Sequence, residues 1–375
     1  MSSTLQTQKG IEPSEIGPEE ILQRAQAGEE ISVDEAERLF LADGKELKSL
    51  VQTADELRRR SVGDVVTFVK NRNINFTNIC AGSCRFCAFR RRPSDPDAYV
   101  LDAEQIASKV KEALAIDATE VCVQGGLHPD FGLENYLEIL RTIRKISPSI
   151  HIHAFSPAEI DHIAEGENLK VAEVIKALRE DGLNSVPGTA AEILVNPARS
   201  IICPKKISPL RWIEIIKTCH RLGLPTTATI LYGHVETPRE RAQHIEIVRN
   251  IQRETRGFTE FIPLAFFPDN TQLKREGIAS STPSLIESLR VHAVARLMLA
   301  GYINNIQASW VKLGPQGAQL MLGAGANDLG GTLVEENITH AAGGKLQGIS
   351  AEELKQLILD YERVPRQRTT TYELI

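Results

Sequence analysis

The sequence lacks a long apolar run and lacks an excess of positive charge. No apolar stretch among the 375 residues approaches the roughly 18 positions that a membrane-spanning helix requires. The 43 Lys and Arg residues stand against 49 Asp and Glu residues, so the formal net charge is −6. This mildly acidic balance disfavours a nucleic-acid binder that works through a broad basic surface. We therefore expect no membrane and no nucleic acid among the partners of this chain.

Cysteine is also scarce, and no secretory signal is visible. Six cysteines in 375 residues are too few for a disulfide scaffold, although three of them fall close together. The N-terminal stretch contains neither the basic segment nor the apolar segment of a secretory signal. The composition, with 42% apolar and 25% charged residues, is that of an ordinary globular protein. These features predict a globular protein of the reducing cytoplasm.

The first 60 residues combine a polar tail with helical periodicity. Apolar residues recur at helical spacing from Pro18 to about Arg60. Gly28 is placed to end the first helix, and Ser32 is placed to cap the second. We expect residues 1–60 to form a polar tail and a helical layer that does not fold alone.

From Val65 onward, short β-prone runs alternate with longer helical runs, which predicts βα units and a parallel sheet. Eight such strands match the usual size of a (β/α)8 barrel, whose typical length is about 250 residues. The predicted fold class is therefore α/β, a TIM-type barrel over residues 61–330. A partly open barrel is the alternative, because the eighth unit is the least regular. We expect residues 331–375 to form a C-terminal extension, with one helix and an extended tail.

The predicted strands and helices alternate along most of the chain. Strands are expected near Val66–Thr77, Glu120–Gln124, Ile150–Phe155, Leu183–Val186, Thr226–Tyr232, Phe258–Ala265, Ile303–Ser309 and Met321–Gly325. Helices are expected near Asp102–Ile116, Glu134–Ile146, Leu169–Asp181, Pro209–Leu222, Pro238–Glu254, Pro283–Leu299, Pro315–Leu320 and Ala351–Tyr361.

Polar and aromatic residues gather where the predicted strands end, which is where barrel enzymes place their chemistry. Gln124, His153 and Tyr232 stand at three of these ends and are our candidates for catalytic or substrate-contacting residues. His151 and His153 are two positions apart, so they face the same side of a strand. Such a pair can hold a metal, but hydrogen-bonded histidines with a substrate contact from His153 are the simpler interpretation.

The strongest indication of function is the run Cys80-Ala-Gly-Ser-Cys84-Arg-Phe-Cys87, which directly follows the first predicted strand. Three thiolates at this CxxxCxxC spacing can hold an iron–sulfur cluster and leave one iron free, since such clusters normally take four protein ligands. A structural zinc site would need a closed set of four ligands, and the loop supplies no fourth. Buried, unreactive thiols are the remaining alternative.

A barrel whose first strand leads into this motif resembles the radical S-adenosylmethionine (SAM) superfamily. The resemblance implies a 4Fe–4S cluster on Cys80, Cys84 and Cys87, with SAM on the open iron as the source of a 5′-deoxyadenosyl radical. It also implies that Gly125 and Gly126 bring bare backbone to the methionine end of SAM, although two glycines after a strand are often only a turn.

Two further groups near the predicted mouth have alternative interpretations. Glu192 is either a partner of SAM or a carboxylate in the first turn of a helix. The basic run Arg90–Arg92 is either a solvated loop or a docking point for an acidic electron donor.

Longer stretches sharpen the resemblance to one family within the superfamily. They include QGGLHPD, HIHAFSPAEI, YGHVETPRER and the run WVKLG at Trp310–Gly314. These resemble the 4-hydroxybenzyl transferase family of FO synthase, which implies cleavage of the Cα–Cβ bond of L-tyrosine. The 4-hydroxybenzyl fragment would then pass to 5-amino-6-(D-ribitylamino)uracil in deazaflavin biosynthesis.

Menaquinone-pathway radical SAM enzymes, of the aminofutalosine synthase or dehypoxanthine futalosine cyclase type, are the alternative. They tend to carry a glycine-rich PGGGAEI where this chain has PGTAAEI at Pro187–Ile193. A non-enzymatic iron–sulfur carrier is a third possibility, but a carrier would fill all four cluster positions with protein ligands.

The resemblance also implies partners. Closure of the deazaflavin ring would be a second radical reaction with its own cluster, and this chain has one CxxxCxxC motif. We therefore expect a second radical SAM subunit that completes the ring. An electron donor such as ferredoxin or flavodoxin is implied as well, because the cluster must be reduced before SAM is cleaved.

Overall fold

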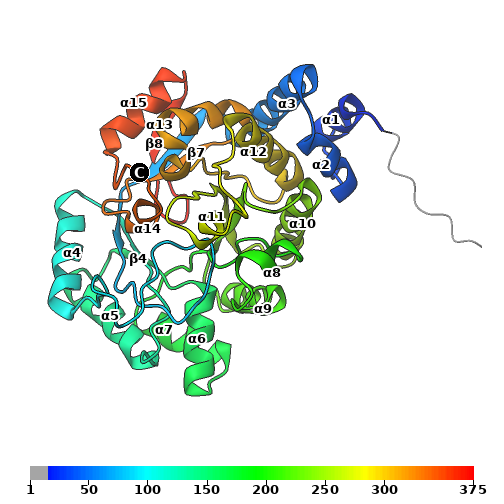
Figure 1. The fold of residues 1–375 in the computed structure, drawn as a ribbon. Helices are drawn as coiled ribbons and strands as arrows, with labels where there is room; N and C mark the ends of the chain where they lie inside the picture. Colours follow the sequence, from blue (N-terminus) through cyan, green and yellow to red (C-terminus); the bar gives the residue numbers. More distant parts are fainter. Residues whose placement is uncertain (1–15) are drawn as a thin grey trace, which may run out of the picture.

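The computed structural model describes residues 16–375, so most of the predicted polar tail lies outside the described residues. Three helices follow it: α1 (Pro18–Gln26), α2 (Val33–Phe40) and α3 (Gly44–Val62). Ser32 caps α2 in a capping box with Glu35, as its position in the sequence predicted. The three helices lie on one side of the molecule, where α2 packs against α10 (Pro238–Thr255) and both α2 and α3 pack against α12 (Leu285–Leu299), while α1 packs on α2 and α3 (Figure 1). No helix among residues 16–375 is long and apolar enough to cross a membrane.

The described chain contains eight strands, all of which pair in parallel. They are β1 (Val65–Val69), β2 (Asn71–Ile74), β3 (Glu120–Val123), β4 (His151–Ala154), β5 (Thr226–Tyr232), β6 (Phe258–Ala265), β7 (Asp328–Gly331) and β8 (Val364–Gln367). The predicted strands near 120–124, 150–155, 226–232 and 258–265 are confirmed. The long strand predicted over 66–77 is divided at Lys70, because β1 pairs with β7 and β8 whereas β2 pairs with β3.

Successive parallel pairings run around a ring. Strands β2, β3 and β4 are neighbours, and single bridges then join His153 to Ser185 and Val186 to Thr226 in β5. After the β5–β6 pair, bridges Phe261–Ile306 and Gln307–Asp328 lead to β7, which pairs with β1. Residues 183–186 and 303–309 thus occupy the barrel positions that the sequence predicted, although only as short bridging segments. The fold is a (β/α)8 barrel.

The predicted strand at Met321–Gly325 is wrong. Residues Leu322–Ala324 instead form a 3-10 helix that continues α13 (Trp310–Met321), and the last barrel strand begins at Asp328. Gly325 has φ +95°, a left-handed conformation that turns the chain out of the helix and into β7. The apolar run that suggested a strand is buried between helices instead, with Met321 and Leu322 fully buried.

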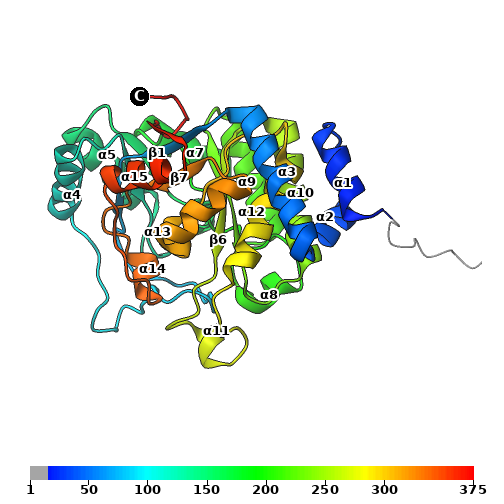
Figure 2. The ribbon, with the colours of Figure 1, turned by 90° about the horizontal axis from the view of Figure 1, so that it is seen from above.

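Most of the remaining helices surround the barrel, whereas α11 and α14 lie across one end of it (Figures 1 and 2). They are α4 (Ala103–Ala115), α5 (Leu133–Ile146), α6 (Pro157–Glu167), α7 (Val171–Glu180), α8 (Ala198–Ile202), α9 (Pro209–Arg221), α11 (Gln272–Arg275), α14 (Asn337–Ala341) and α15 (Ala351–Asp360). The predictions for α4, α5, α7, α9, α10, α12, α13 and α15 are confirmed to within a few residues. Helix α6 was not predicted, because its apolar pattern is short. The signal for its start was the capping box that Ser156 and Glu159 form.

The C-terminal tail closes the base of the barrel. Strand β8 pairs with β1 on the side opposite β7, and the chain then turns inward. Arg368 donates from Nε to Asp328 Oδ2 at 2.5 Å and from Nη2 to Oδ1 at 3.1 Å. The Tyr372 hydroxyl donates to Glu260 at 2.8 Å. Figure 2 shows the C-terminus at the end of the barrel opposite α11 and α14.

Candidate functional site

A cavity of about 590 Å³ runs down the barrel interior. Side chains alternate across a strand, so every second residue of β2, β3 and β4 points inward. The strand register places Asn71 beside Glu120, and Asn73 beside Cys122 and His153, all of which line the cavity. The three cysteines of the motif line the cavity at the carboxyl ends of the strands, and Arg368 and Thr370 line it at the base. The cavity therefore has a thiol-bearing mouth and a polar floor.

The cysteine loop is held by the chain that follows it. The Cys80 N–H donates to the Arg91 carbonyl at 3.0 Å, and the Arg90 guanidinium donates to the Gly82 carbonyl at 2.7 Å. Arg91 also donates to the Ala88 carbonyl at 2.9 Å. The basic run thus has a structural task that neither sequence interpretation anticipated, since two of its three side chains brace the backbone of the loop.

The motif thiols form a half-buried group around the mouth. Burial raises the pKa of the Cys84 thiol to about 11 and also raises the pKa of Cys87, so iron binding must displace protons. Among residues 16–375, no three His, Cys, Asp or Glu side chains converge closely enough to ligate one metal ion. A cubane cluster binds each thiolate through a different iron, so three thiols that line one mouth suit it.

The glycine pair after β3 is fixed by close packing. A Cβ at Gly125 would lie 2.5 Å from the Phe76 ring, and a Cβ at Gly126 would lie 2.2 Å from the Ile79 carbonyl oxygen. The Gly126 N–H also donates to the Thr77 carbonyl at 2.9 Å. Both glycines line the cavity. The absence of a Cβ at these two positions therefore lets Phe76 and the start of the cysteine loop lie directly against the segment after β3, and the contact with SAM that the resemblance implies stays a prediction.

Glu159 is a site residue that the sequence reasoning missed. Its carboxylate accepts hydrogen bonds from the Gly125 N–H at 3.1 Å and from the N–H of Ser156 at 2.6 Å. It lines the cavity, and burial raises its pKa to about 7. The signal that could have found it is the Ser-Pro-Ala-Glu run at the end of β4, a capping-box pattern placed where a barrel keeps its site.

Glu192 lies in the cavity wall and pairs with a lysine. Lys206 Nζ is 2.6 Å from Glu192 Oε1, and both side chains line the cavity. Residue 192 has φ +47° and lies outside every helix, so the alternative of a carboxylate in a first helical turn is wrong. Lys206 also lies 5.4 Å from the centroid of the Phe86 ring, which brings this ion pair beside the cysteine loop.

Gln124 and His153 line the cavity as predicted. The His153 Nδ1 lies 2.7 Å from the Ser185 hydroxyl, and the His151 Nε2 lies 2.7 Å from the same oxygen. Burial lowers the pKa of His153 to about 4, so its imidazole is neutral at pH 7. The two histidines therefore share one serine hydroxyl.

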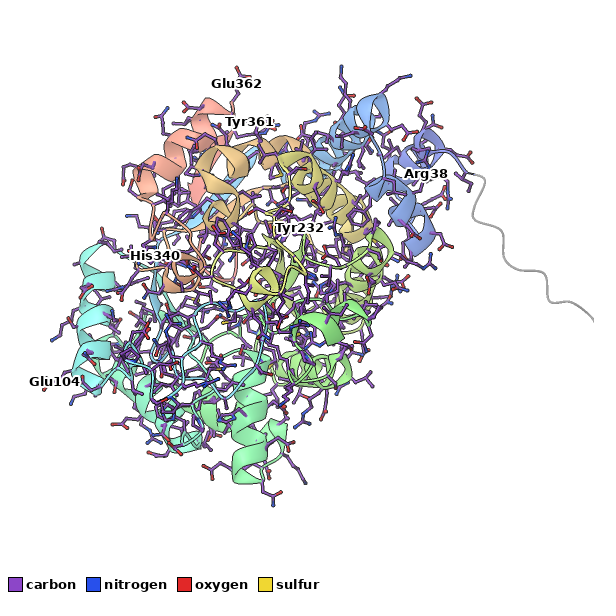
Figure 3. All side chains as sticks on the ribbon, in the orientation of Figure 1. Arg38, Glu104, Tyr232, His340, Tyr361 and Glu362 are labelled. Atoms are coloured by element: carbon purple, nitrogen blue, oxygen red, sulfur yellow. The ribbon has the colours of Figure 1, made fainter. Side chains whose placement is uncertain are left out.

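Tyr232, the third candidate, lies outside the cavity. Its side chain is fully buried, and its hydroxyl lies 2.9 Å from the Ser288 hydroxyl of α12. Tyr232 does not line the cavity, whereas the preceding residue, Leu231, does. Figure 3 labels Tyr232 close to α12, the helix that carries Ser288. The sequence placed Tyr232 correctly at the end of β5 but did not reveal which face of the strand it occupies.

Comparison with known proteins agrees with this geometry. The family model described as "Radical SAM superfamily" matches residues 74–248, and the model described as "CofH/MqnC C-terminal region" matches residues 255–375. A 5-amino-6-(D-ribitylamino)uracil–L-tyrosine 4-hydroxyphenyl transferase of Methanocaldococcus jannaschii is 49% identical over 92% of this chain and 97% of its own. The enzyme of the same name from Archaeoglobus fulgidus is 50% identical over 86% of this chain and 92% of its own. This chain belongs to that transferase family of the radical SAM superfamily.

Two solved structures of low sequence identity share the fold of this chain. Methylornithine synthase (PylB) has a TM-score of 0.70 at 17% identity, and the match covers 92% of this chain and 97% of that one. A maturase of the [FeFe]-hydrogenase, HydG, has a TM-score of 0.73 at 16% identity, covering 95% and 77%. Membership of the superfamily implies a 4Fe–4S cluster and SAM, and the thiols and bare backbone at the mouth fit both.

Proposed function

We propose that this chain cleaves the Cα–Cβ bond of L-tyrosine and transfers the 4-hydroxybenzyl group to 5-amino-6-(D-ribitylamino)uracil. The observation that carries the proposal is the likeness of nearly the whole chain to transferases of that name, at 45–50% identity. The motif cysteines and the glycine pair, to which the family resemblance assigns the cluster and SAM, line one cavity. The cavity volume is within the range of about 300–1,000 Å³ that small-molecule sites occupy.

In this proposal, Cys80, Cys84 and Cys87 hold the cluster. When bound, the cluster and SAM would supply the 5′-deoxyadenosyl radical that takes a hydrogen atom from the amino group of tyrosine. Cleavage of the Cα–Cβ bond would then leave 2-iminoacetate beside the 4-hydroxybenzyl fragment that is transferred. The Gly125–Gly126 backbone is placed to receive the methionine end of SAM. Glu159 and Glu192 are the carboxylates that we assign to its ammonium group or its ribose hydroxyls, because both line the cavity.

The rest of the cavity holds the substrates and keeps out water and stray hydrogen donors. The tail lies across the base, and Arg368 and Thr370 line the cavity there, so we propose that cofactor and substrates enter at the mouth. Neutral His153 can form a hydrogen bond with a substrate through its Nε2, because its Nδ1 is already bonded to Ser185. The Gln124 amide offers a donor and an acceptor to the pyrimidine or the phenol.

Two partners complete the proposal. A second radical SAM subunit closes the deazaflavin ring, since this chain carries one CxxxCxxC motif. An electron donor such as ferredoxin or flavodoxin reduces the cluster, and we place the reaction in the cytoplasm.

The test is product analysis by mass spectrometry after anaerobic reconstitution with iron and sulfide. With SAM, a reductant, tyrosine and the ribitylated diaminouracil, we expect the 4-hydroxybenzyl adduct together with 5′-deoxyadenosine. Omission of tyrosine should abolish the adduct. Release of 5′-deoxyadenosine only with a futalosine-pathway substrate would instead establish the menaquinone-type activity. Formation of the finished chromophore by this chain alone would refute the second subunit.

A further inference from the structure

Lys312 stands apart from the other cationic side chains that line the cavity. Arg368 is paired with Asp328, Lys206 is paired with Glu192, and Arg90 donates to the Gly82 carbonyl. Lys205 is exposed at the rim. Lys312 is half-buried and lines the cavity, yet it forms no ion pair and no side-chain hydrogen bond with any of residues 16–375.

The start of α13 holds Lys312 in this position. The Trp310 indole N–H donates to the Gly331 carbonyl at 2.9 Å, and Trp310 is buried. The Lys312 N–H donates to the Ser309 carbonyl at 3.1 Å, so the lysine backbone is fixed in the first turn of the helix. An ammonium group that the fold directs to a cavity without an anionic partner costs solvation free energy, and burial indeed lowers the pKa of Lys312. A bound anion would remove that cost.

Lys312 is also at the right depth in the cavity. It follows Ser309 at the carboxyl end of the bridging segment 303–309, which is the end of the barrel that carries the cysteine loop, and it lines the cavity together with Cys87, Glu192 and Glu336. Glu192 is already paired with Lys206. The hydrogen atom is taken from the amino group of tyrosine beside the cluster, and the carboxylate of an amino acid shares its α-carbon with the amino group. The substrate carboxylate must therefore lie at this same level, and it must be paired there.

We propose that Lys312 binds the α-carboxylate of the amino acid substrate, an assignment that rests on the proposed function. The ion pair fixes the amino group near the radical source, while the phenol side chain extends into the cavity. Lys312 is thus a substrate-binding residue that selects an amino acid over the corresponding amine.

The experiment measures binding rather than turnover. Tyrosine and tyramine, which lacks the carboxylate, are titrated calorimetrically into anaerobically reconstituted, unreduced enzyme saturated with SAM. For Lys312→Met we expect the Kd of tyrosine to rise at least tenfold, with the Kd values of tyramine and SAM unchanged. Lys312→Arg, which keeps the charge, should restore most of the affinity for tyrosine. Lys111→Met removes an exposed lysine of α4 and should change none of the three values.

The possible failures can be told apart. An unchanged tyrosine affinity in Lys312→Met overturns the assignment, and so does an equal loss for tyrosine and tyramine. A loss confined to SAM also overturns it, because the lysine would then serve the carboxylate of SAM. If the wild-type enzyme binds a futalosine-pathway substrate but not tyrosine, the proposed function itself has failed. Matching circular dichroism spectra and iron contents of all variants show that a loss is not one of folding or of the cluster.

Discussion

The floor and the mouth of the cavity are both polar, but they differ in how many of their polar side chains have partners within the protein. At the floor, Asp328 and Glu260 meet Arg368 and Tyr372, and Thr370 donates to Glu120 at 2.5 Å. The mouth contains the ion pair Glu192–Lys206, and Glu159 and Arg90 form hydrogen bonds with the backbone there. Two polar side chains of the mouth have no partner, since those of Gln124 and Lys312 form no side-chain hydrogen bond with any of residues 16–375.

This contrast indicates which polar groups of the cavity stabilise the fold and which are available to bind ligands. A buried charge without a partner is costly, so a fold normally saturates such groups unless a ligand does so. The saturated floor is therefore a structural plug made by the C-terminal tail. The unsaturated mouth is a site that cofactor and substrate complete. Variants at the floor should affect stability first, and variants at the mouth should affect ligands first.

The largest effect is expected for the mouth variant Cys84→Ala. Loss of one of three protein ligands should abolish cluster assembly and reduce activity below detection. The urea midpoint of the iron-free protein should change little, because this thiol faces the mouth. Iron analysis of the reconstituted protein checks the prediction, with Cys219→Ala as the control because Cys219 is buried on α9 away from the cavity. Four irons per chain in Cys84→Ala would contradict it.

At the floor, Arg368→Met should destabilise the protein by about 3–5 kcal/mol, because it leaves the Asp328 carboxylate buried without its cation. Urea unfolding of the iron-free protein measures the change. Arg366→Met, an exposed arginine of the same strand β8, should change the stability by less than about 0.5 kcal/mol. A second substitution, Asp328→Asn, should recover part of the loss. Equal stability of the two arginine variants would mean that the tail does not plug the barrel.

The same contrast explains how much could be predicted from sequence. The mouth is built from local patterns, namely the cysteine spacing, the Gly125–Gly126 pair and the polar strand ends, and these were predicted. The floor depends on partners far apart in the chain, since Arg368 reaches Asp328 and Thr370 reaches Glu120. No local pattern encodes such a pairing. The extended tail was predicted, but its insertion beneath the barrel was not.

The direction of side chains at the strand ends was the second feature that could not be predicted from the sequence. Period two fixes which residues share a face of a strand, but at a strand end it does not decide which face is inside. His153 was therefore placed correctly while Tyr232 was not. Partners contributed by loops, such as Lys206 for Glu192, carry no periodic signal at all. The eighth strand was misplaced because an apolar helix end resembles a buried strand over four or five residues.

A smaller effect at the mouth is expected for Gly126→Ala. The new Cβ would lie 2.2 Å from the Ile79 carbonyl oxygen and 2.9 Å from Cys80 Cβ, so the cysteine loop must move. We expect activity to fall by about ten- to a hundredfold, with a weaker Kd for SAM. Gly166→Ala is the matched control, because a Cβ there meets nothing within 4 Å and the residue lies in helix α6. That variant should keep full activity, and an equally active Gly126→Ala would show that the close packing is not required.

The smallest effect concerns Glu159, which lies between the two regions because its carboxylate is saturated by backbone donors yet lines the cavity. Its pKa of about 7 exceeds the ordinary value of 4.5, so near pH 6 the folded protein binds a proton that the unfolded chain has lost. Stability should therefore fall as pH rises, with Glu159 contributing about 1.4 kcal/mol between pH 6 and pH 8. Glu159→Gln cannot ionise and should lose this part of the slope, while the contribution of Glu260, whose pKa is also raised to about 7, remains in both proteins. Parallel stability curves for the two proteins would show that Glu159 is already ionised in the iron-free fold, and the mouth would then carry an unmatched negative charge ready for the ammonium group of SAM.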